Sequence, residues 1–110
     1  MTRQHLTRFK DQFTEWQNEF GLKEYTVSFK TKKFKDRFAE IEVNAEGCIA
    51  TVWVNESEKW NNRLIDTVAK HECIHLLLGR FAELASSRYV NEDELSAEEE
   101  RVVCVLEKVL

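Results

Sequence analysis

The chain has 110 residues, a length that suits one domain, spanning residues 1–110, with a single modest core. Hydrophobic residues make up 43% of it and charged residues 33%, as in ordinary globular proteins, and no apolar run approaches a membrane span. The net charge is −4 and no block is strongly basic, which argues against a nucleic-acid partner.

The first residues lack the apolar core of a signal peptide, so we expect a cytoplasmic protein with no membrane partner, and we expect it to be a monomer. The three cysteines, Cys48, Cys73 and Cys104, form no C-x-x-C pair. An odd set of scattered cysteines indicates small buried thiols in a reducing compartment.

The chain begins with an amphipathic pattern. Leu6, Phe9, Phe13, Trp16 and Phe20 recur at steps of three and four residues, and Gly21 closes the run. This spacing predicts an N-terminal helix with one apolar face. Its polar face mixes acids and bases, so packing on a sheet is a better explanation than lying on a membrane surface.

Three strands are predicted next. Apolar residues alternate with polar ones around residues 25–29 and again around 39–43, and a continuous apolar run covers 48–54. The Glu46-Gly47 turn between the last two runs indicates a hairpin. We therefore expect a three-stranded, mainly antiparallel sheet.

The fourth predicted element is a helix that carries the most informative motif of the chain. Asn61 and Asn62 offer an N-cap, and apolar residues then recur at helical spacing until Gly79. Gly79 is either a C-cap or a point where another element comes close. A loop near residues 85–91 and a C-terminal helix to Leu110 complete an α+β domain.

The motif is His71-Glu72-Cys73-Ile74-His75, an H-E-x-x-H run. Residues four apart on a helix share a face, so both imidazoles can bind one zinc ion. Glu72 lies beside them and is expected to act as general base on the attacking water without binding the metal. Cys73 points away from the histidines on a helix and is not expected to be a ligand.

Catalytic zinc sites take three protein ligands, so one more is needed. We expect a carboxylate of the C-terminal helix. Glu99 is favoured, because spacing from Val102, Val103 and Leu106 puts it on the apolar stripe, and Glu98 and Glu100 are the alternatives. Ser96 and Glu99 also fit a capping box, which would use Glu99 differently, whereas a helix start at Asn91 with Glu94 would leave it free.

An oxyanion donor is also expected near such a site. Arg88 and Tyr89, in the loop after the motif helix, are the candidates.

A helix with H-E-x-x-H, followed about two dozen residues later by a glutamate on a second helix, resembles the gluzincin class of zinc metallopeptidases. The small size resembles its minimal single-domain members from microbes and phages. The segment from Glu99 through Val102 is also similar to the E-x-x-A-N-x-F-A segment of ImmA/IrrE-type peptidases, although Val103 stands where that family has asparagine and thermolysin-like enzymes have aspartate.

The resemblance implies a zincin-like domain, Zn²⁺ as cofactor, and hydrolysis of a peptide or protein substrate paired with strand 48–54. The alternative is a regulatory protein that keeps the fold and acts by binding a partner, because so small a domain offers little surface for substrate subsites. An intact Glu72 argues for the enzyme, since a structural zinc site needs no base beside its ligands.

Overall fold

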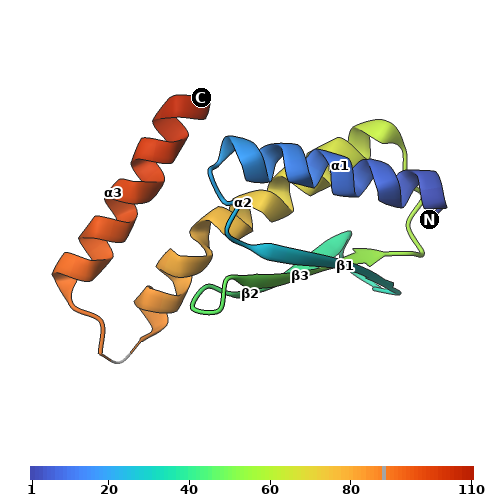
Figure 1. The fold of residues 1–110 in the computed structure, drawn as a ribbon. Helices are drawn as coiled ribbons and strands as arrows, with labels where there is room; N and C mark the ends of the chain where they lie inside the picture. Colours follow the sequence, from blue (N-terminus) through green and yellow to red (C-terminus); the bar gives the residue numbers. More distant parts are fainter. Residues whose placement is uncertain (88) are drawn as a thin grey trace.

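The computed structural model describes residues 1–87 and 89–110. Its elements are α1 (Arg3–Glu19), β1 (Thr26–Lys32), β2 (Ala39–Asn44), β3 (Ile49–Asn55), α2 (Asn62–Ser86) and α3 (Glu92–Val109). Helices α1 and α2 cover one face of the sheet, and α3 extends away from it (Figure 1). The α+β class predicted from the sequence is confirmed.

The sheet has the strand order β1-β3-β2. Strands β2 and β3 form the predicted antiparallel hairpin, but β1 pairs with β3 in parallel, so the sheet is mixed and not mainly antiparallel. Hydrophobic alternation shows which face of a strand is buried and says nothing about its neighbour, which is why the parallel pairing was missed.

This strand order has a consequence for substrate binding. Strand β3 is central and is paired along both sides, so residues 48–54 offer no open edge for a peptide strand. The expectation of a substrate strand added there is wrong. The open edge nearest to α2 belongs to β2, which pairs only with β3 among the strands of the described residues.

Helix α1 packs on the sheet, as its apolar spacing predicted. Thr2 caps it by accepting a hydrogen bond from the backbone N–H of His5 at 3.1 Å. Phe9 and Phe13 are fully buried, and both rings meet Phe29 of β1 edge to face, with centroids 6.3 and 5.3 Å apart. These contacts fix α1 over β1.

Helix α2 begins where the sequence predicted and ends later. The side chain of Asn61 accepts from the backbone N–H of Leu64 at 2.9 Å, and the helix continues past Gly79 to Ser86. Gly79 is therefore no C-cap. A Cβ at Gly79 would lie 2.6 Å from Cγ1 of Val43, so the glycine allows α2 to approach β2 closely.

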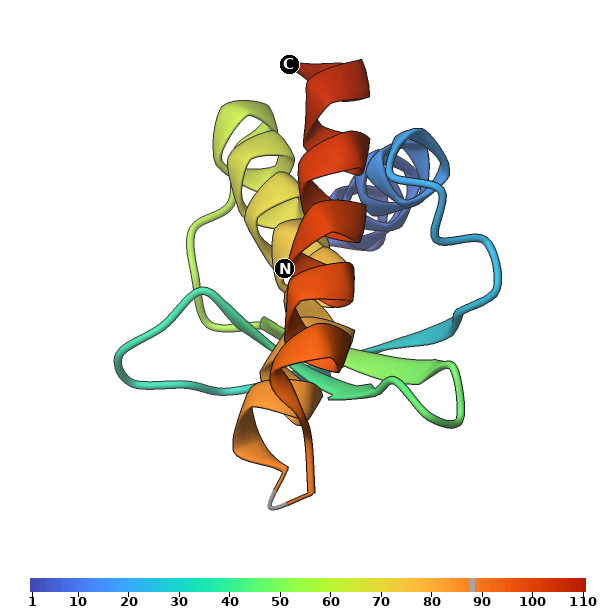
Figure 2. The same cartoon turned by 90° about the vertical axis from the view of Figure 1, so that its left-hand side faces the viewer.

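Helix α3 runs back along the outer side of α2 (Figure 2). Asn91 caps it by accepting from the backbone N–H of Glu94 at 2.8 Å, which confirms the start at Asn91 and not at Ser96. No helix in residues 1–87 and 89–110 is long and apolar enough to cross a membrane.

Candidate metal centre and cleft

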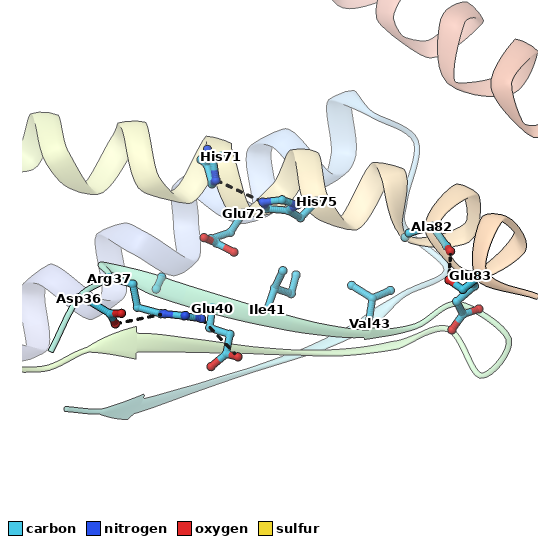
Figure 3. Close-up of a pocket in the computed structure, with 13 residues that line it drawn as sticks. Asp36, Arg37, Glu40, Ile41, Val43, His71, Glu72, His75, Ala82 and Glu83 are labelled. Atoms are coloured by element: carbon cyan, nitrogen blue, oxygen red, sulfur yellow. Dashed lines mark hydrogen bonds and ion pairs between the residues drawn. The ribbon is translucent and has the colours of Figure 1, made fainter. Parts of the chain in front are cut away.

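The two histidines of the motif converge on one point. Their Nε2 atoms are 3.2 Å apart, and the rings are inclined by 75° with centroids 4.9 Å apart. Both side chains project from one side of α2 (Figure 3) and are exposed to solvent. This arrangement follows from their four-residue spacing on a regular helix.

Glu72 lies between the histidines and the sheet (Figure 3). Glu72 is 5% exposed, whereas His71 and His75 are exposed. Burial raises the pKa of its carboxyl group above the ordinary value, and the nearby His75 and His71 partly oppose this shift. A carboxylate made more basic by burial is better suited to accept a proton.

The histidine pair fits a zinc ion. Two nitrogen ligands at 2.0–2.1 Å from zinc in tetrahedral geometry lie about 3.3 Å apart, close to the separation seen here. The structure therefore places two imidazole nitrogens at a separation that suits one ion. Within residues 1–87 and 89–110, no third His, Cys, Asp or Glu joins them in a group able to hold a metal ion.

The predicted third ligand, Glu99, is exposed and is not brought to the histidines. Glu98 is the buried glutamate of this helix, 6% exposed, so the prediction that Glu99 alone points inward is wrong. The error has a clear cause: Val103, used to place the apolar stripe, is 39% exposed and lies outside it. Glu100 is exposed as well.

Glu98 has a structural partner. Its Oε1 accepts from Nε of Arg101 at 2.6 Å, and Arg101 also donates to the backbone carbonyl of Leu77 at 3.2 Å. Leu77 lies two residues after His75, about 200° around the helix. Helix α3 therefore packs on the side of α2 that faces away from the histidines, and Glu99 would reach them only if α3 moved.

Tyr89, one of the two candidate oxyanion donors, is not placed at the histidines. Tyr89 is 87% exposed and follows Ser86, which itself lies about 16 Å along the α2 axis from His75. Arg88 lies outside the described residues. Their roles stay predictions.

The histidines open into a cleft between α2 and the open edge of β2. Its volume is about 580 Å³. One wall is formed by Ala39, Ile41 and Val43 of β2, and the other by the motif residues, Gly79 and Glu83 of α2. Asp36 and Arg37, from the loop before β2, lie at the end of the cleft near His71 (Figure 3).

A second hollow of about 440 Å³ adjoins the first beside His71 and Glu72. Most of its lining is apolar, from Phe38 and Ala39 on one side and Leu64 and Val68 on the other. Leu64 and Val68 precede His71 by seven and three residues, so they share its side of the helix. The two hollows together have room for an extended peptide, with one of its apolar side chains in the second hollow.

Sequence reasoning favoured neither Arg37 nor Glu83 as a site residue, although both line the cleft. Nothing local to the loop that carries Arg37 indicated its approach to Glu72. The position of Glu83 in the sequence could have indicated that it lies on the cleft side of α2. It follows Glu72 by eleven residues, very nearly three helical turns, and therefore shares its face.

Comparison with protein-family models, with curated proteins and with solved structures gives no match for this chain. The function of the chain is therefore inferred from the geometry of the cleft and the motif.

Proposed function

We propose that this protein is a zinc-dependent peptidase with a zincin-like site. The observation that carries the proposal is the convergence of His71 and His75 Nε2 atoms beside the buried Glu72, inside a cleft bordered by an open strand edge. An ion-binding pair, a buried base and a place for an extended chain are the parts that peptide hydrolysis requires.

His71 and His75 are the residues that would hold the ion. Zinc, when bound, acidifies a coordinated water and polarises a carbonyl group. Glu72 accepts the proton from the attacking water and delivers it to the departing amine, so one carboxyl group serves as base and then as acid. Its burial favours the first of these steps, because a raised pKa makes the carboxylate a better proton acceptor.

The substrate is an extended peptide paired with the open edge of β2. Backbone groups along an edge strand bind a peptide without regard to its sequence, and side-chain pockets add selectivity. The hollow lined by Leu64, Val68 and Phe38 suits an apolar side chain next to the bond that is cleaved.

A partner-binding role is the second candidate. It is favoured by the finding that only two metal ligands come together within residues 1–87 and 89–110. In that case the β2 edge would bind a protein segment without cutting it, and Glu72 would have no chemical task.

The test compares zinc-loaded wild type with Glu72→Gln on an unfolded protein substrate and a peptide library. We expect cleavage by the wild type, at least about 100-fold slower cleavage by the variant, and arrest by a chelator. The amide cannot accept a proton, and it preserves size and hydrogen-bonding shape. Equal inactivity of both proteins, with unchanged binding of a common partner, would favour the second candidate.

A further inference from the structure

Glu83 lies in the same cleft as the histidines, at the opposite end from Asp36 and Arg37 (Figure 3). It is eight residues past His75 on α2, about 12 Å along the helix axis. At that separation Glu83 is out of reach of an ion held by the histidines. It can still contact a peptide that occupies the length of the cleft.

The carboxylate of Glu83 is held in a defined position. The backbone N–H of Ala45, the residue after β2, donates to its Oε1 at 3.1 Å. Ala45 is 1% exposed, so its amide is fixed by the core. In the part of the chain that the structure describes, 1–87 and 89–110, no group donates to Oε2. One oxygen thus anchors the side chain while the other remains for a ligand.

We infer that Glu83 is a specificity residue that selects a lysine or arginine in the bound peptide, three to four residues from the bond at the histidines. The inference rests on the proposed function, because it takes the peptide to lie along β2. An extended chain advances about 3.3 Å per residue, which sets the number of residues that span about 12 Å. A fixed carboxylate attracts ammonium and guanidinium groups and repels acidic ones.

The experiment measures peptide binding to the Glu72→Gln protein in the presence of zinc. Fluorescein-labelled ten-residue peptides carry a central apolar residue and have Lys, Gln or Glu at the third and fourth positions on both sides of it. Fluorescence anisotropy then gives the dissociation constants. The symmetric design makes the result independent of the direction in which the peptide binds.

We expect the lysine peptide to bind about fivefold more tightly than the glutamate peptide, as for a partly exposed ion pair. Adding Glu83→Gln should reduce this ratio below about twofold, and Glu83→Lys should reverse it. Glu83→Gln keeps an oxygen to accept from Ala45, so folding should be preserved, which circular dichroism verifies. Glu46→Gln is the matched control: it removes an exposed charge one residue from Ala45 and outside the cleft.

An unchanged ratio in Glu83→Gln, an equal loss in Glu46→Gln, or no binding of any peptide would overturn the inference. The readout is binding to a protein that lacks its base, so it is separate from cleavage. A Glu83-dependent lysine preference together with a wild type that cleaves nothing would uphold the specificity residue and reject the peptidase.

Discussion

Gly79 determines how closely the motif helix approaches the sheet. In most helix interiors, replacing glycine by alanine gains about 1 kcal/mol of stability. Here the added methyl group would lie 2.6 Å from Cγ1 and 3.3 Å from Cβ of Val43, and a β-branched side chain has few other rotamers. The packing cost therefore exceeds the gain in helix propensity.

We accordingly predict that Gly79→Ala lowers the free energy of unfolding by about 1–2 kcal/mol. Urea denaturation measures this change. The double variant with Val43→Ala should recover part of the loss, because it removes the colliding methyl groups. A more stable Gly79→Ala protein would show that α2 and β2 are farther apart than described.

The cysteines differ in their surroundings more than the sequence indicated. Cys73 is fully buried, and burial raises the pKa of its thiol to about 12, whereas Cys48 is partly exposed and Cys104 exposed. Only the buried state of Cys73 matches the expectation of buried thiols.

Since the thiolate is the reactive form, iodoacetamide at pH 8 should label Cys104 quickly and Cys73 only after unfolding. Mass spectrometry of the native and denatured protein distinguishes the two sites. Rapid native labelling of Cys73 would mean that the core beneath the motif opens readily.

At the scale of elements, α3 is attached to α2 through the Glu98–Arg101 pair and the Leu77 carbonyl. Glu98 is nearly enclosed while about a third of the Arg101 side chain is exposed, so solvent screens part of the interaction. Removing the carboxylate leaves Arg101 without its partner but still in contact with water.

We predict that Glu98→Ala destabilises the protein by about 1–2 kcal/mol, and that Glu99→Ala changes stability by less than about 0.5 kcal/mol. Zinc affinity, measured on the same variants, should be unaffected by Glu99→Ala in the arrangement described. Weaker zinc binding in Glu99→Ala would instead support the ligand role predicted from the sequence, with α3 moving on metal binding.

Much of the fold was accessible from the sequence because it depends on local patterns. The spacing of Phe9 and Phe13 predicted the face of α1, and the turn at Gly47 predicted the β2–β3 hairpin. The spacing of His71 and His75 predicted their convergence, since a helix fixes the geometry of residues four apart.

What could not be predicted depends on contacts distant in the chain. The placement of β1 beside β3 is set by packing and not by alternation. The phase of α3 was misjudged because its buried stripe contains Glu98, a charged residue whose burial is compensated by Arg101, which in turn donates to the Leu77 carbonyl of α2. The cleft itself arises from the approach of β2 to α2: Gly79 allowed for a close approach at that point, but nothing in the sequence indicated which element makes it.

At the scale of the molecule, the chain is elongated, with extents of 45 × 29 × 22 Å and a radius of gyration of 14.8 Å. A compact domain of this length would have a radius of gyration of about 13 Å. The difference reflects α3, which extends beyond the body formed by the sheet, α1 and α2 (Figures 1 and 2). The candidate site therefore belongs to the body alone, with α2 and β2 as its two walls.

We propose that this body, formed by the sheet, α1 and α2, holds one zinc ion through His71 and His75. Elemental analysis of protein purified without added metal, then after zinc addition and gel filtration, tests it most directly. We predict close to one equivalent of zinc in the wild type after addition, and loss of most of it in His71→Ala and in His75→Ala. Less than about a tenth of an equivalent in the wild type, with no uptake on zinc addition, would contradict the account.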